Sequence, residues 1–161
     1  MAARLTIIEY GGKVLCASAN HWGMSTLKKA GKTIRLSDYG GTSHACEYET
    51  SLYLALKPHL VDMSKAVDER SPLSASFKTD LLAGSHPDGA DARLVPYWSS
   101  VTASGVMGDA TKATKEKGEQ FLEAAIEGVI ALVRELRRTE ILPRRDQHVR
   151  EWQSEMEATE R

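Results

Sequence analysis

A long apolar stripe near the C-terminal end constrains the fold of this chain most strongly. From Thr111 or Thr114 to about Arg138, apolar side chains follow i, i+4 and i+8 spacing, which predicts one long amphipathic helix. Asp109 is its candidate N-cap, and the arginines near its end suit the negative end of the helix dipole. Such a helix needs a second layer to cover its apolar face. The stripe consists of Phe121, Leu122, Ala125, Ile126, Val129, Ile130, Val133 and Leu136.

The first twenty residues indicate one helix-to-strand unit. Arg4–Tyr10 fits either a short strand or the end of a helix, and Gly11–Gly12 provides a helix stop or a tight turn. Lys13–Ser18 is a short apolar run, for which we expect a buried strand. A helix, a Gly-Gly turn and a buried strand together are typical of the αβ half of an α/β layer fold.

The middle of the chain contains a second helix and a long irregular stretch. Glu49–Val61 begins with helical spacing of its apolar residues, and Pro58 is expected to end or kink that helix. A shorter element is expected around Thr26–Ala30 within a polar loop. Asp68–Gly108 has no clear periodicity, so it is either a functional loop or an excursion with short elements of its own.

Composition excludes several classes of protein. The 161 residues carry 21 Lys and Arg against 22 Asp and Glu, which gives no electrostatic signature for a nucleic-acid or membrane partner. Charged residues interrupt the longest apolar stretch, and the N-terminus lacks the pattern of a secretion signal. Two cysteines do not form a disulfide framework. We therefore expect one domain in the cytoplasm, with reduced thiols.

The densest polar cluster lies in residues 43–51. His44 and Glu47 are three residues apart, so they can face the same point if the segment makes a helical turn. An imidazole and a carboxylate suit zinc, manganese or iron, and histidine suits proton transfer near neutral pH. The alternative is that Thr42 or Ser43 caps the following helix and that His44 is a surface residue.

Two segments resemble the creatininase (creatinine amidohydrolase) family. Residues 44–52 read HACEYETSL and are followed by LALKP and LV, which is similar to the family signature HAGE-x-ETSL…LAL-x-P-x-LV. Residues 104–118 contain SGVMGDAT and ATKEKG, which resemble the family segment GV-x-GDPT-x-A(S/T)-x-EKG. The two segments occur in the family's order, and the resemblance covers about Lys13 to Leu136.

The resemblance implies an α/β protein with a three-layer α/β/α metallohydrolase fold. Members of the family open a small lactam ring or cleave amide-like bonds with one or two divalent metals and a bound water. The resemblance implies that His44 is the catalytic proton shuttle or a hydrogen-bond donor to the transition state. It places Glu47 beside the metal and Trp22 where relatives carry a tryptophan that faces the substrate. Trp98, in the long irregular stretch, is a second candidate for substrate contact.

The chain lacks the segments that carry the family's main metal ligands. These are a Glu-x-His pair with a following Asp, and an Asn-Gly-His-Gly-Gly-Asn-like loop; neither occurs here. The resemblance therefore predicts a partial fold without the N-terminal half, spanning residues 1–142. For residues 143–161 the sequence predicts a charged tail, helical or disordered. Partners expected from the resemblance are a small-molecule substrate and either further copies of the chain or a complementing N-terminal fragment.

Two functions from different classes follow. The first is a metal-dependent amidohydrolase that acts on a cyclic amide or a similar C–N bond and uses zinc, manganese or iron. The second is a catalytically inactive remnant, or an interaction subunit that keeps the helices of the fold. Gly40 and Gly41 replace an aromatic-acidic pair of the creatinine-opening member, Cys46 replaces a glycine and Ala110 replaces a proline. Creatinine itself is therefore not the expected substrate.

Overall fold

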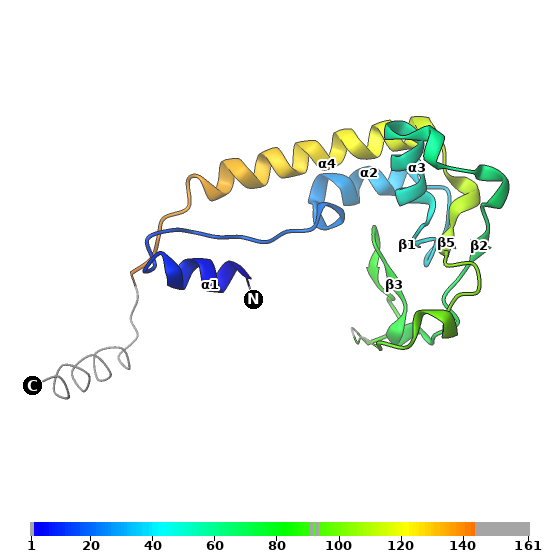
Figure 1. Cartoon of the computed structure of the whole chain (residues 1–161), viewed down its shortest axis with the longest axis horizontal. Coiled ribbons are helices and arrows are strands. Elements are labelled where there is room, and N and C mark those ends of the chain that lie inside the picture. Colours follow the sequence, from blue (N-terminus) through cyan, green and yellow to red (C-terminus); the bar gives the residue numbers. More distant parts are fainter. Residues whose placement is uncertain (1, 91, 93, 144–161) are drawn as a thin grey trace, which may run out of the picture. The chain divides into compact units, whose positions relative to one another are not determined.

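The computed structural model describes residues 2–90, 92 and 94–143, and the chain divides into two compact units. One unit comprises residues 19–133, and the other combines residues 1–18 with 134–161. The helices are α1 (Ala2–Glu9), α2 (Ser25–Ile34), α3 (Glu47–Leu56) and α4 (Lys115–Leu136). The strands are β1 (Thr42–His44), β2 (Asp68–Glu69), β3 (Thr79–Asp80), β4 (Gly84–Ser85) and β5 (Met107–Asp109) (Figure 1).

The N-terminal segment is helical and is not followed by a strand. Helix α1 ends at Glu9 and is followed by Gly11 and Gly12, whose φ angles of 60° and 74° are in the left-handed region. The Gly12 amide donates to the Ile7 carbonyl at 2.8 Å, the closing bond of a Schellman motif. The helical alternative and its glycine stop are thus confirmed. The predicted strand at Lys13–Ser18 is wrong: the segment has no regular secondary structure, and none of the described strands pairs with it.

A small antiparallel sheet supports the larger unit. Its strand order is β1-β5-β2, with Thr42 opposite Gly108 in one pair and Asp68 opposite Asp109 in the other. Strands β3 and β4 form a separate hairpin. The predicted mixture of helices and strands is confirmed, and these short elements show that Asp68–Gly108 is an excursion with structure of its own. The three-layer arrangement stays a prediction.

Helix α4 buries the face that carries its smallest side chains. Gly118, Ala124, Ala125 and Gly128 are buried together with Phe121. Because a Cβ atom at Gly118 would lie 1.9 Å from the Ser51 carbonyl oxygen, the glycine lets α3 approach closely, and α2 and α3 lie along α4 (Figure 1). The predicted helix is confirmed, but much of its predicted stripe is outside the core. Its exposed large residues are Ile126, Val129, Ile130 and Val133, each 42–49% exposed.

The cap of α4 differs from the prediction. Asp109 caps a separate 3-10 turn, Ala110–Lys112, by accepting from the Thr111 amide. The Thr114 hydroxyl accepts from the Lys117 amide at 3.2 Å and thereby caps the start of α4. Both residues are short polar side chains with good capping propensity, so spacing alone did not distinguish them.

The core of the larger unit joins α2, α3 and α4. Its buried apolar residues include Leu27, Cys46, Tyr48, Leu82 and Phe121. The Tyr48 and Phe121 rings meet edge to face with centroids 5.1 Å apart, a favourable aromatic geometry. These contacts fix the start of α3 against α4, and so fix the turn that precedes α3.

The predicted domain limit at residue 142 stays a prediction, and the charged tail predicted for residues 143–161 lies outside the described residues from position 144 onward. Among the described helices, none has the length and apolar character needed to span a bilayer.

Replacing Gly118 with alanine tests the close approach of α3 and α4. In an ordinary helix interior this change stabilises by about 0.5–1 kcal/mol. Here the new methyl group meets the Ser51 carbonyl, so we expect a loss of about 1–3 kcal/mol in the free energy of unfolding. Urea denaturation measures it. The exposed Glu123→Ala change on the same helix is the control, with an effect within about 0.5 kcal/mol. A Gly118→Ala protein as stable as the parent would contradict the packing.

Candidate functional site

His44 lies at the end of β1, directly before a strained turn. Ala45 has a φ angle of 48° and is the one non-glycine residue with positive φ among the described residues. Such a conformation costs energy and is held by its surroundings. The Ala45 amide donates to Glu49 Oε2 at 2.5 Å, and Cys46 is the N-cap residue of α3. The turn therefore fixes the direction in which the chain leaves His44.

A cavity of about 630 Å³ opens beside this turn. His44 and Glu49 line it, and His44 Nδ1 lies 4.0 Å from Glu49 Oε2. His21 also lines the cavity, and Asp62 and Lys65 add charged groups to its wall. The apolar part of the wall includes Leu52, Leu60, Val61, Met63, Ala66 and Val106. An apolar cavity with few polar groups is the usual form of a small-molecule site.

The two predicted tryptophans lie near the histidines of this cavity but do not line it. The Trp98 ring meets the His44 ring edge-on, with centroids 5.0 Å apart. The Trp22 ring meets His21 in the same way at 4.9 Å and packs partly against the core. Both tryptophans thus support cavity histidines, and direct contact with a substrate stays a prediction for each.

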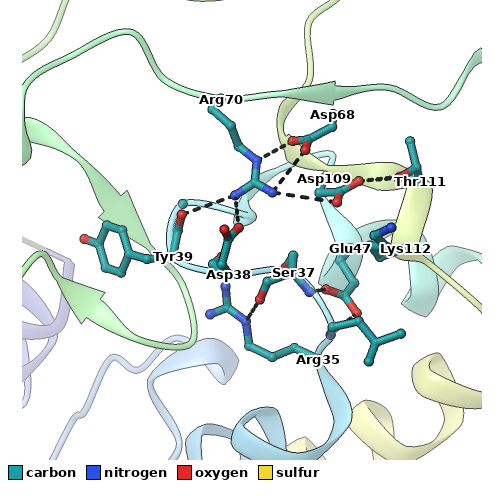
Figure 2. Close-up of polar contacts among 12 residues, drawn as sticks. Arg35, Ser37, Asp38, Tyr39, Glu47, Asp68, Arg70, Asp109, Thr111 and Lys112 are labelled. Carbon is teal, nitrogen blue, oxygen red and sulfur yellow. Dashed lines mark hydrogen bonds and ion pairs between the residues drawn. The ribbon is translucent and has the colours of Figure 1, made fainter.

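Glu47 does not share the cavity with His44. Its side chain is fully buried, and its carboxylate accepts from the Leu36 and Ser37 amides at 2.8 Å each. Lys117 Nζ donates to Glu47 Oε1 at 2.5 Å and also donates to the Lys112 carbonyl. Figure 2 shows Glu47 turned toward Ser37. The predicted convergence of Glu47 with His44 is wrong, and the metal-ligand role of Glu47 stays a prediction.

Glu49 is the carboxylate that sequence reasoning missed. Cys46 is the N-cap of α3, so Glu49 is the third residue of the helix. Its carboxylate reaches back to accept a hydrogen bond from the Ala45 amide in the preceding turn. A capping box uses the same reach, from a glutamate at this helix position back to an amide before the helix. The predicted cap at Thr42 or Ser43 is wrong because both residues belong to β1. The capping pattern, applied to the correct helix start, would have identified Glu49.

The charge of Glu47 is stabilised inside the protein. Burial alone raises a carboxyl pKa, but hydrogen bonds from Lys117 and from the Leu36 and Ser37 segment outweigh burial, so the pKa of Glu47 is lowered. Burial also raises the pKa of the Cys46 thiol, and there the neighbouring hydrogen bonds do not outweigh it, so the Cys46 pKa is raised to about 11. Cys46 is therefore a buried neutral thiol, and a nucleophilic role does not fit it.

A second polar network holds the loop before β1. Arg70 forms ion pairs with Asp38, Asp68 and Asp109, and it donates to the Tyr39 carbonyl (Figure 2). Since Asp68 belongs to β2 and Asp109 to β5, one guanidinium ties two strands of the sheet to the loop. These interactions are structural, and they lie beside a different cavity from the one that contains His44.

The described residues do not by themselves form a complete metal site. No group of three or more potential histidine, cysteine, aspartate or glutamate ligands occurs among them, and His44 with Glu49 supplies only two side chains. A protein zinc site has about three or four such ligands. The residues present therefore do not fit a complete divalent-metal centre.

Comparison with known proteins identifies relatives of this chain. A family profile for creatinine amidohydrolase matches residues 1–133. A creatinine amidohydrolase from Pseudomonas putida is 33% identical over 98 residues, which are 57% of this chain and 30% of that protein. These 98 residues are less than a third of the curated relative.

Solved structures share the fold. A protein from Bacteroides fragilis is 24% identical, with a TM-score of 0.61, and the match covers 88% of this chain and 50% of that chain. A manganese creatininase is 27% identical, with a TM-score of 0.55 and coverage of 86% and 49%. The chain thus spans about half the length of these solved relatives.

Replacing Lys117 with methionine tests the buried ion pair. The change leaves the Glu47 carboxylate buried without its cation, so we expect a loss of about 3–5 kcal/mol in the free energy of unfolding. Adding Glu47→Gln should recover part of that loss, and the exposed Lys115→Met, which removes the 3.6 Å pair with Glu119, should cost under about 1 kcal/mol. Urea denaturation compares the three. Equal losses for Lys117→Met and Lys115→Met would contradict the assignment.

The same pair has a pH dependence with a defined sign. Because the pKa of Glu47 is lower in the folded than in the unfolded protein, its contribution is complete above about pH 4.3, the ordinary glutamate value. The contribution is lost as pH falls through the folded pKa. Stability measured from pH 7 to pH 3 should fall less steeply for Glu47→Gln than for the parent. Parallel curves would contradict this result.

Proposed function

Because this chain belongs to the creatininase family, we propose that it carries the proton-transfer part of a metal-dependent amidohydrolase. The reaction class is hydrolysis of a cyclic amide or a similar C–N bond in a small molecule. The observation that carries the proposal is that His44 and Glu49, one before and one after the strained turn at Ala45, line the same cavity.

His44 is the proposed proton shuttle. Histidine exchanges a proton near neutral pH, so it can take a proton from an attacking water and give it to the leaving nitrogen. Glu49 is the proposed positioning residue, because its carboxylate lies beside His44 Nδ1 and is itself fixed by the Ala45 amide. The Trp98 ring, in edge contact with the imidazole, further restricts the orientation of His44.

A small ring-shaped substrate suits the cavity. Leucine, valine and methionine side chains can enclose a ring, while Glu49 offers an acceptor for an amide N–H. Trp22 and Trp98 are proposed to contact the substrate after small movements, and the proposal includes no nucleic acid. A cytoplasmic location is part of the proposal.

A divalent metal, zinc, manganese or iron, is proposed from family membership, and one solved relative is a manganese creatininase. Such a metal would supply Lewis-acid activation of water and carbonyl when bound. Because His44 and Glu49 supply only two side chains, we propose that the main ligands come from residues outside the described set or from another chain.

A second candidate function is an interaction subunit without catalysis. The exposed apolar residues of α4 favour it, since Val129 and Ile130 are 42% and 43% exposed. An uncovered helix face of this kind promotes association, either with another copy or with a complementing fragment. The two candidates differ in whether an assembled complex hydrolyses amides.

The decisive test is hydrolysis of small lactams by the chain, alone and co-expressed with a polypeptide that supplies the rest of the fold. We expect the chain alone to bind little metal and to be weakly active, and the complex to turn over substrate. In the complex, His44→Ala should lower the rate by about a hundredfold or more, since general acid-base catalysis contributes about 10²–10⁴. The melting temperature should stay nearly unchanged because His44 is exposed. Full turnover by the His44→Ala complex would refute the proposal.

Association of the chain is expected independently of catalysis. Light scattering of the purified chain at micromolar concentration should show oligomers, and Val129→Glu with Ile130→Lys should shift the population toward monomer, because charges on the α4 face oppose its burial. The matched control is Glu123→Lys, at an exposed position of α4 that is already charged. A monomeric parent chain with a cooperative melt would contradict this expectation.

A further inference from the structure

We propose that His21 is a second ligand-binding residue of the cavity, fixed by the buried hydroxyl of Tyr48 so that its Nε2–H donates to an oxygen atom of the ligand. The inference rests on the proposed function only for the class of ligand, an amide. The site itself follows from contacts that do not involve His44.

The position of His21 is determined by aromatic neighbours. His21 begins a 3-10 turn, His21–Gly23, and its exposed ring lines the cavity. Its Nδ1 lies 2.7 Å from the Tyr48 hydroxyl oxygen. Tyr48 is fully buried and packs edge-on against Phe121, so the hydroxyl is a fixed point of the core. An exposed side chain is thereby oriented by a rigid element beneath it.

The hydrogen bond selects the tautomer of His21. A buried hydroxyl needs a partner, and among the described residues His21 Nδ1 is the partner that the Tyr48 hydroxyl has. Burial, followed by the charges of Glu49 and Cys46, raises the pKa of Tyr48, so the phenol keeps its proton and can donate it. A neutral imidazole that accepts at Nδ1 carries its hydrogen on Nε2.

The second ring nitrogen of His21 is the one left for a ligand. Nδ1 is bonded to the Tyr48 hydroxyl and the exposed His21 lines the cavity, so the Nε2–H group is assigned to the ligand. The cavity then offers a donor from His21 and an acceptor from Glu49. This pair matches an amide, whose carbonyl oxygen accepts and whose N–H donates.

The tautomer can be measured on the full chain without activity. Two-dimensional ¹⁵N NMR at about pH 8.5, above the usual histidine range, should show His21 wholly as the Nε2–H form. Tyr48→Phe removes only the hydroxyl and should move His21 to the tautomer mixture of the exposed His59, which is the internal control. An Nδ1–H form in the parent, or no change in Tyr48→Phe, would overturn the inference.

Ligand contact is tested by titrating 2-pyrrolidinone, a simple lactam, into the same samples. The His21 Nε2–H signal should shift. The asparagine of His21→Asn has an amide that reaches only the position of Nδ1, so the donor at the Nε2 position is lost. This variant should bind the lactam about tenfold more weakly, the equivalent of one hydrogen bond of about 1.4 kcal/mol. His21→Gln, whose amide reaches the Nε2 position, should retain affinity within about threefold. Equal affinity in the parent, His21→Asn and His21→Gln would overturn ligand contact.

Failure of this inference is distinguishable from failure of the proposed function. If the tautomer and lactam results hold but the assembled complex does not hydrolyse amides, His21 marks a binding site in a non-catalytic protein. If hydrolysis depends on His44 but His21 shows the Nδ1–H form, the proposed function stands and the role of His21 is wrong.

Discussion

The buried carboxylate of Glu47 is the interaction on which the rest of the larger unit depends. It joins three segments that are distant in sequence: the loop at Leu36 and Ser37, the first turn of α3, and Lys117 in the first turns of α4. A buried carboxylate without these partners would cost several kcal/mol, so its presence requires all three segments to be in place. The turn at Ala45, and with it His44 and Glu49, is fixed as a consequence.

Two carboxylates separated by one residue thus have different roles because of helix geometry. Successive positions of a helix point about 100° apart, so Glu47 and Glu49 face opposite sides of the first turn of α3. Glu47 faces the core and α4, while Glu49 faces the cavity and the Ala45 amide. Both negative charges lie in the first turn of α3, where the positive end of the helix dipole stabilises them. The acidic start of α3 therefore contributes both to stability and to the candidate site.

Sequence periodicity predicted the helices but not which atoms face one another. Helices α3 and α4 follow from apolar spacing, and α3 ends at Leu56, two residues before Pro58, as expected for a helix that a proline terminates. The apolar stripe of α4 did not predict the buried face of the helix. Close packing against Ser51 and Thr26 requires glycine and alanine, and a hydrophobicity pattern gives these small residues little weight. The strand at Lys13–Ser18 failed because a strand needs a pairing partner, which is not encoded locally. His44 was found from its motif, whereas His21 depends on a contact 27 residues away in sequence.

Glu47 anchors the larger unit, whereas Glu49 and His44 line the cavity, and this division of roles can be measured. Carboxyl ¹³C NMR of the full chain during titration with a lactam tests it most directly, because each glutamate is observed separately. The Glu49 signal should shift together with the His44 ring signals, while the Glu47 signal stays constant. A shift of the Glu47 signal with an unchanged Glu49 signal would contradict this division of roles.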